Sequence, residues 1–163
     1  SINDTYRQAK EFLEAGRFVL FTGTPCQVDG IKALCPKGCE EHLICMDIVC
    51  HGVPSPRVWN DYKAYVERKY HGKIEKIDFR NKERFGWSDH WETVTINGKE
   101  HDSQVYMKMF YEHTFLREAC YVCPYKNLQR ISDISIADAW GVERLLTRNS
   151  MIIGEFHLFL LIH

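Results

Sequence analysis

RFVLFTGTPC, the stretch from residue 17 to residue 26, decides the fold because it joins an apolar strand directly to the start of a helix. The apolar residues within Arg17–Thr22 are continuous rather than alternating, which is typical of a strand covered on both faces in a parallel sheet. Gly23 ends this strand, and Thr24 with Pro25 forms the N-cap and first turn of the helix that follows. The order of strand, tight turn and helix predicts an α/β fold.

The same plan is repeated further along the chain. Residues 43–50 form a second apolar strand, and Ser55 with Pro56 begins the helix after it. A helix closed by Gly16 precedes the first strand. The helix after Pro56 has a buried stripe at helical spacing, which consists of Val58, Trp59, Tyr62, Val66 and Tyr70. These successive units predict a Rossmann-like arrangement with a mainly parallel sheet.

The hydrophobic pattern changes after Gly72. Residues 73–80 and 91–96 indicate two further strands, and Asn97 with Gly98 is typical of a two-residue hairpin turn. Strands joined by so short a turn can only be antiparallel. This part of the chain therefore predicts a small antiparallel β insertion in the α/β fold.

The rest of the chain is expected to complete a single domain. We expect a third helix over about residues 104–118 and one more strand over residues 130–137. The chain has 163 residues, of which 45% are hydrophobic, and this is enough for one sizeable core. The sequence therefore predicts one α/β domain over residues 3–144 and a divergent tail over residues 145–163.

Composition excludes several classes of function. The formal net charge is −1, and the basic residues are spread along the chain, so no nucleic-acid partner is expected. No apolar stretch approaches the roughly 20 residues of a membrane span, and no signal peptide is recognisable, which predicts a cytoplasmic protein. Seven cysteines fit poorly with a fully paired disulfide framework and favour reduced thiols or thiolate ligands.

Four of the cysteines have positions that suit a metal cluster. Cys120 and Cys123 form a CxxC pair, whereas Cys26 and Cys50 each follow one of the two apolar strands. If these strands are parallel neighbours, both of the latter cysteines emerge at the carboxyl edge of the sheet, where open α/β folds place ligands. Helix N-termini follow closely and favour thiolates over thiols. A metal cluster is therefore the first hypothesis.

Other interpretations of the cysteines stay open at this point. A lone CxxC is often only a turn with buried thiols. Cys35 and Cys39 lie in a predicted surface turn and are candidates to join the CxxC pair in a closed, structural zinc site. Cys45 lies inside a predicted strand and is most simply a small core residue.

Charged residues near the predicted strands also need an explanation. Asp47 stands inside an apolar strand, and a buried carboxylate needs a partner, for which Arg80 and Arg130 are the candidates. Together with Asp133 and Asp138, Arg130 is interpreted as part of an ion network that lines the site.

These residues carry a resemblance to a known family. The chain resembles the C-terminal domain of the coenzyme F-420 hydrogenase/dehydrogenase beta subunit, and the resemblance extends over most of its length. The matching pieces, in order, are Gly23–Gln27, Cys50–Pro56, Phe79–Arg80 with Gly86–Trp87, Cys120–Cys123, and Arg130–Asp133 through Trp140–Gly141.

The resemblance implies an iron-sulfur flavoprotein that passes electrons or hydride between coenzyme F-420, FAD and a 4Fe-4S cluster. Carried over residue by residue, the cluster ligands are Cys26, Cys50, Cys120 and Cys123, the four thiolates that a cubane needs. Three further residues are the implied flavin-binding residues, because their loop precedes a helix N-terminus. They are Gly23, Thr24 and Gln27.

The resemblance also implies partners. The chain is expected to work as part of an oxidoreductase, together with a redox partner protein or an N-terminal ferredoxin-like domain that these 163 residues do not include. The isolated fragment is then expected to be inactive alone. Two hypotheses remain: a redox domain that holds an iron-sulfur cluster, and a zinc-stabilised or metal-free interaction module of a larger assembly.

Overall fold

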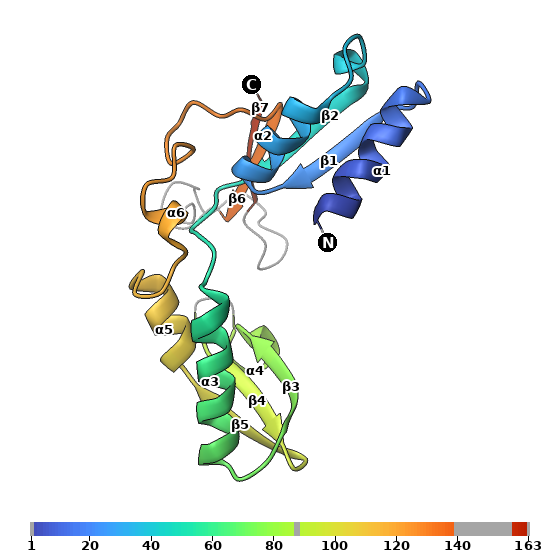
Figure 1. The fold of residues 1–163 in the computed structure, drawn as a ribbon. Helices are drawn as coiled ribbons and strands as arrows, with labels where there is room; N and C mark the ends of the chain where they lie inside the picture. The colour runs from blue at the N-terminus through green and yellow to red at the C-terminus, as the bar shows by residue number, and fades with distance from the viewer. Residues whose placement is uncertain (1, 87–88, 139–157, 163) are drawn as a thin grey trace, which may run out of the picture. The chain divides into compact units, whose positions relative to one another are not determined.

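The computed structural model divides the chain into two compact units (Figure 1). Unit 1 consists of Ser1–His51 and Pro124–His163, and unit 2 consists of Gly52–Cys123. The single domain expected over residues 3–144 stays a prediction. Trp87, Trp140 and most of the expected tail lie outside the residues that the structure describes, which are 2–86, 89–138 and 158–162.

Unit 1 contains a four-stranded sheet in the order β1-β2-β6-β7. The first three strands are parallel to one another, and β7 is antiparallel to β6. The elements are α1 (Ile2–Glu14), β1 (Val19–Gly23), α2 (Pro25–Leu34), the 3-10 turn η1 (Glu40–His42), β2 (Leu43–Ile48), β6 (Ile134–Asp138) and β7 (Leu158–Ile162). The predicted parallel α/β sheet is thus confirmed.

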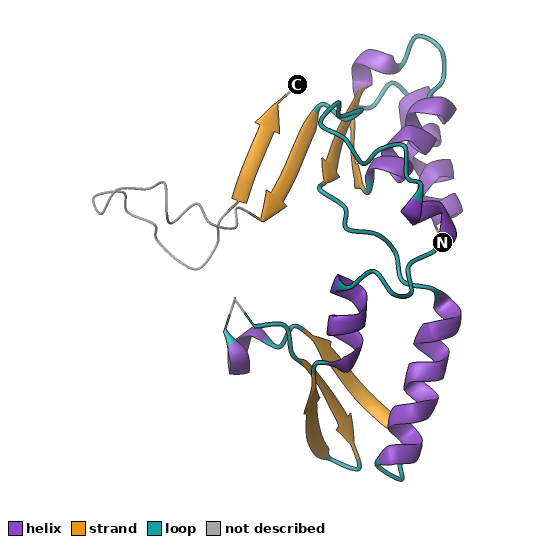
Figure 2. Cartoon of the chain, turned by 90° about the vertical axis from the view of Figure 1, so that its left-hand side faces the viewer, coloured by secondary structure: helices purple, strands orange, loops and turns teal. Residues whose placement is uncertain are grey.

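The helices of unit 1 lie together on one side of its sheet (Figure 2). The core between α1, α2 and this face consists of Ala9, Leu13, Phe21, Val28, Ile31, Leu43 and Cys45. Within the described residues, the opposite face of β1 and β2 has no helix over it, and Leu20, Ile44 and Ile48 are exposed there. The expectation that the first strand is covered on both faces therefore does not hold for the described part of the chain.

Unit 2 is built on a separate antiparallel sheet in the order β3-β4-β5. Its elements are α3 (Pro56–Lys69), β3 (Ile74–Phe79), α4 (Lys82–Phe85), β4 (Glu92–Ile96), β5 (Lys99–Ser103), α5 (Val105–Tyr111) and α6 (Glu118–Tyr121). Asn97 and Gly98 join β4 to β5 with φ values of 50° and 67°, as a type I′ hairpin turn requires. The antiparallel insertion and its turn are confirmed.

Helix α3 packs on this antiparallel sheet. It is therefore not available to cover the exposed face of β1 and β2. Tyr62 and Val66 of α3 are buried with Val94 and Ile96 of β4. The ring centroids of Tyr62 and Tyr106 lie 5.0 Å apart, so aromatic packing also joins α3 to α5. The buried stripe predicted for this helix is real, but its partner is the sheet of unit 2.

The helix expected over residues 104–118 is broken in the structure. α5 ends at Tyr111, and His113 adopts a φ of 58°, which no α-helix accommodates. The four-residue helix α6 then begins at Glu118. No helix among the described residues combines the length and apolar content that a membrane span requires.

A buried carboxylate organises the core of unit 2. Glu92 is fully buried and accepts hydrogen bonds from the Tyr62 hydroxyl at 2.9 Å and from the backbone N–H groups of Tyr106 and Met107 at 3.0 and 3.3 Å. It thereby satisfies free N–H groups in the first turn of α5. Burial, and next the negative charge of Glu92, raise the pKa of the Tyr62 phenol.

Replacing Tyr62 with phenylalanine is expected to lower the free energy of unfolding by about 1.5–3 kcal/mol, because it removes a buried hydrogen bond to a charged group. The raised pKa also means that the folded chain holds the phenolic proton more tightly than the unfolded chain does. Stability from this group is therefore complete below pH about 10 and is lost as the pH rises further. Urea unfolding between pH 7 and 11 should show this alkaline loss in the wild type and a smaller one in Y62F. Equal alkaline losses would contradict the assignment.

Candidate functional site

Cys26 and Cys50 follow neighbouring parallel strands at the same edge of the sheet in unit 1. The register of β1 and β2 pairs Gly23 with Asp47, so each cysteine stands three residues beyond a member of this pair. Parallel strands end at one edge, and ligands bind there in open α/β sheets. The predicted placement of these two cysteines after their strands is confirmed.

Cys26 occupies the second position of helix α2. Thr24 is the N-cap and Pro25 the first residue of this helix. The Cys26 thiol is exposed and lies 3.2 Å from the Thr24 hydroxyl. The first N–H groups of a helix have no partner within the helix. Cys26 therefore stands at an accessible helix start, as a metal-binding thiol requires.

The other residues of this loop cap the N-terminus of α2. The backbone N–H of Thr24 donates to the side-chain oxygen of Gln27 at 2.9 Å. A Cβ atom added to Gly23 would lie 2.9 Å from the same oxygen, so only glycine leaves room for it. Gly23, Thr24 and Gln27, the three predicted flavin-binding residues, thus share a capping arrangement at the N-terminus of α2.

The variant Gly23→Ala is expected to displace Gln27 and lower the free energy of unfolding by about 1 kcal/mol, the usual contribution of a helix cap. Gln27→Ala removes the same hydrogen bond directly. Because both changes act on one cap, the double variant should be less destabilised than the sum of the single variants. Chemical denaturation of the three variants measures this, and strict additivity would show that Gly23 does not act through Gln27.

The chain after Cys50 pairs with the chain before Cys120. In unit 2, Ser55 N–H donates to the Phe115 carbonyl at 2.8 Å, and Arg117 N–H donates to the Val53 carbonyl at 2.8 Å. These bonds flank an antiparallel bridge between Pro54 and Leu116. The bridge is isolated, because the chain enters helix α6 two residues after Leu116.

The CxxC segment is held by its own short helix and by a tyrosine. Cys120 N–H donates to the Arg117 carbonyl at 2.8 Å in the first turn of α6. The Tyr121 hydroxyl donates to the His113 carbonyl at 2.7 Å and accepts from Leu116 N–H at 3.1 Å. Cys120 and Cys123 are half-buried free thiols. The two thiols are therefore presented from a fixed turn of unit 2.

Tyr125 ties the segment that follows the CxxC pair to helix α2. Its hydroxyl donates to the Asp29 carboxylate at 2.6 Å. Asp29 lies three residues after Cys26, so it belongs to the same turn of α2. Sequence reasoning missed this bond, because a half-buried tyrosine and an exposed aspartate 96 positions apart leave no recognisable pattern.

A buried ion pair supports the carboxyl edge of the parallel sheet. Asp47 is fully buried and accepts from Arg130 Nη2 at 2.8 Å and from the Ser135 hydroxyl at 2.6 Å. Of the two candidate partners, Arg130 is thus the one that pairs with it. Asp133 instead accepts from Cys45 N–H at 2.7 Å and lies 3.9 Å from the ammonium of Lys32.

The three remaining cysteines belong to the core side of unit 1. Cys45 is fully buried, as predicted, and burial raises the pKa of its thiol to about 11. Burial, followed by the nearby Glu40, also raises the pKa of Cys35. The Cys39 thiol donates to the Leu13 carbonyl at 3.5 Å. Cys35 and Cys39 flank an exposed turn at Lys37 and Gly38, as expected, but their side chains are half-buried against the core.

No three His, Cys, Asp or Glu side chains among the described residues are gathered into an arrangement that could hold a metal ion. Each unit presents two of the four predicted ligands: Cys26 and Cys50 in unit 1, and Cys120 and Cys123 in unit 2. The four-cysteine ligand set therefore stays a prediction.

Comparison with known protein families gives a match over most of the chain. Residues 16–153 match the family model that describes the C terminus of the coenzyme F-420 hydrogenase/dehydrogenase beta subunit. The matched range begins shortly before β1 and contains all seven cysteines. A search of curated proteins found no match.

Proposed function

Because this chain belongs to the family defined by the C terminus of the coenzyme F-420 hydrogenase/dehydrogenase beta subunit, we propose that it is an electron-transfer domain that holds a 4Fe-4S cluster. The family is named for a subunit of a redox enzyme, so oxidoreductase chemistry is the class of function. The proposed ligands are the thiolates of Cys26, Cys50, Cys120 and Cys123.

One strand register supports the proposal. The parallel register of β1 and β2 gives Cys26 and Cys50 equal offsets from a paired position at one sheet edge. In unit 2, Cys120 lies in α6 and Cys123 follows just after it, so these two thiols are neighbours in the chain.

The chemistry of the thiols disfavours two of the other cysteines. Iron-sulfur clusters bind thiolates, so a ligand must lose its proton. The raised pKa values of Cys35 and Cys45 oppose this loss. Cys26, by contrast, is exposed at the N-terminus of α2, where a metal ion can reach it. The zinc alternative uses Cys35 and is less favoured for this reason.

FAD and coenzyme F-420 are the proposed redox partners of the cluster. When bound, FAD supplies hydride exchange with the deazaflavin, and the cluster supplies storage of single electrons. Gly23 and Thr24 stand at a helix start, where backbone N–H groups suit a phosphate or a flavin carbonyl. The side-chain oxygen of Gln27 is held by Thr24 N–H, which leaves its amide NH2 group as the donor.

The proposed site needs a second redox component. A beta subunit works with other subunits, so we propose that electrons pass to a redox partner protein or to an N-terminal ferredoxin-like domain. The 163-residue chain is then expected to bind the cluster but to show no turnover of coenzyme F-420 by itself.

Anaerobic reconstitution of the chain with ferrous iron and sulfide tests the proposal. We expect a brown protein with about four irons and four sulfides per chain, whose absorbance bleaches on reduction with dithionite. A colourless chain that takes up one zinc ion instead would support the interaction module. A chain that binds neither metal in stoichiometric amount would rule out both metal sites.

A further inference from the structure

The outer edge of the sheet in unit 1 is formed by β1. Within the described residues, β1 pairs with β2 on one side and stands last in the sheet order. Every second residue of such a strand directs its N–H and C=O groups away from the sheet. An edge of this kind is a template for another extended strand.

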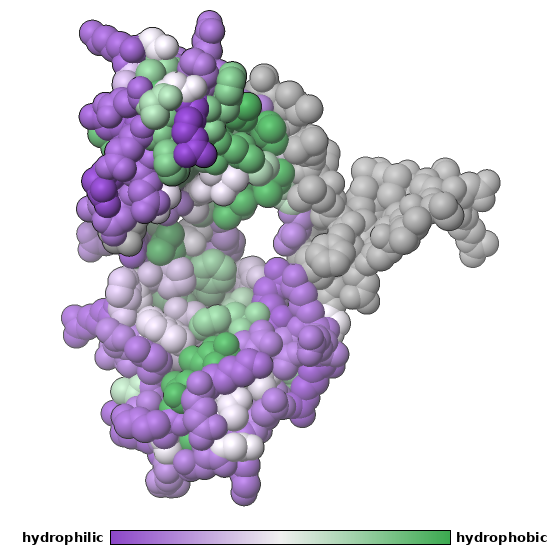
Figure 3. Space-filling view, turned by 90° about the vertical axis from the view of Figure 1, so that its right-hand side faces the viewer, coloured by the Kyte–Doolittle hydropathy of each residue, from purple (hydrophilic) through white to green (hydrophobic). Residues whose placement is uncertain are grey.

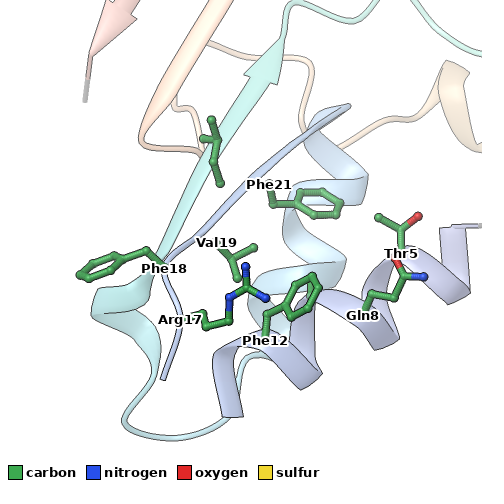
Figure 4. Close-up of a pocket in the computed structure, with 9 residues that line it drawn as sticks. Thr5, Gln8, Phe12, Arg17, Phe18, Val19 and Phe21 are labelled. Carbon is green, nitrogen blue, oxygen red and sulfur yellow. The ribbon is translucent and has the colours of Figure 1, made fainter. Parts of the chain in front are cut away.

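A groove of about 330 Å³ borders this edge, between α1 and β1 (Figure 4). In Figure 1, α1 lies on the side of β1 opposite to β2. Buried Ala9 and Phe21 contribute to the lining, while Thr5, Gln8 and Phe12 extend into it from α1. The groove therefore offers an apolar interior directly beside the unpaired backbone of β1.

Helix α1 turns an uncharged stripe toward this groove. Thr5, Gln8 and Phe12 carry no charge and recur at helical spacing, and Phe12 is 43% exposed. Four of the five charged residues of α1 pair with one another elsewhere on the helix, in the salt bridges Arg7–Glu11 and Lys10–Glu14. An exposed stripe without charges, next to an open strand edge, is suited to burial against another polypeptide.

The composition of β1 is that of an inner strand. Phe18 and Leu20 are 74% and 59% exposed, whereas Phe21 on the covered face is buried. Figure 3 shows apolar surface on this side of unit 1. Residues 18–23 contain no charge and no proline, and their register with β2 is regular, so the strand lacks the charges, prolines and bulges that protect many edge strands. Strands that are apolar on both faces normally have neighbours on both sides.

We propose that β1 pairs with an apolar strand of a partner polypeptide, which lies in the groove beside α1 and extends the parallel sheet. The orientation is taken as parallel, in keeping with β1, β2 and β6, which are parallel to one another. The chain belongs to a family of enzyme subunits, so a partner polypeptide is expected, and the proposal does not depend on the cluster.

Arg17 adds a charge preference to this surface. It is the one charged residue among the described residues that line the groove, and its guanidinium lies over the Phe12 ring at 4.4 Å from the centroid. Arg17 precedes β1, so it stands near the N-terminal end of a parallel strand. The partner strand is therefore expected to carry Asp or Glu just before its apolar run.

A synthetic peptide tests the proposal. The probe is a capped peptide with one glutamate, five alternating valine and isoleucine residues, and a Gly-Ser tail for solubility. At saturation we expect the β1 amides that point away from β2 to exchange hydrogen roughly tenfold more slowly, as measured by NMR. The same peptide with prolines at two consecutive central positions lacks one N–H that faces β1 in either register, so it cannot complete the pairing and should have no effect.

Two matched variants of the chain locate the effect. Gln8→Trp fills the groove and should abolish the protection of β1, whereas Lys10→Trp, on the charged part of the same helix, should leave it intact. The proposal is overturned if the glutamate peptide slows no β1 amide, or if the proline peptide protects equally. It is also overturned if the chain alone sediments as a dimer with β1 already protected, since a second copy then occupies the edge.

Discussion

Replacing Cys26 with alanine is expected to reduce the iron content of the anaerobically reconstituted chain from about four atoms to less than one. A cubane cluster needs four protein ligands, and the exposed Cys26 thiol can be removed without opening the core. Alanine is also compatible with the second position of a helix. Iron and sulfide analysis, together with circular dichroism to verify the fold, measures the effect.

Matched controls are available in the same chain. Cys35→Ser and Cys39→Ser should retain about four irons, because their half-buried thiols are not proposed ligands. The zinc alternative predicts the reverse: these two changes would abolish metal binding, and Cys26→Ala would leave it unchanged. Full iron content in Cys26→Ala would therefore eliminate the proposed ligand set.

Replacing Arg130 with alanine is expected to destabilise unit 1 by about 3–5 kcal/mol, the usual effect of removing one partner of a buried ion pair. Asp47 is fully buried, and the Arg130 side chain is only 7% exposed. The variant leaves the Asp47 carboxylate with the Ser135 hydroxyl as its remaining side-chain donor. Denaturant unfolding measures the loss.

The double variant Asp47→Ala with Arg130→Ala separates the lost pairing from the lost packing. It should be less destabilised than the sum of the two single variants, because no buried charge is left alone. Arg7→Ala breaks an exposed pair on α1 and should change the free energy of unfolding by no more than about 0.5 kcal/mol. If Arg130→Ala and Arg7→Ala lowered the free energy of unfolding equally, burial would not determine how much the Asp47–Arg130 pair contributes to stability.

Local signals were sufficient to predict the elements of unit 1. The continuous apolar run before Gly23 and the Thr24-Pro25 pair identified β1 and the start of α2. Asp47 was recognisable as a buried carboxylate because its neighbours in the strand are apolar, and its partner was among the two arginines considered. In each case the signal depends on residues that are close in the sequence or that share one strand.

Other features could not be predicted because the sequence does not record which surfaces meet. The stripe of α3 showed that this helix has a buried face, but not that β4 rather than β2 would cover it. Nothing in the residues around His113 indicated the left-handed conformation that separates α5 from α6. Glu92 was overlooked because it begins β4, where Thr93 and Thr95 make the strand less apolar than the one that contains Asp47.

Cys26 and Cys45 differ in exposure, so their rates of alkylation report two different properties of the folded chain. A thiol-alkylating reagent can reach the exposed Cys26 in the native state, whereas the enclosed Cys45 becomes accessible only when the interior of unit 1 opens transiently. The labelling rate of Cys45 therefore reports the opening free energy of that interior without any denaturant. Mass spectrometry can follow both rates in a single anaerobic sample, before and after iron is supplied.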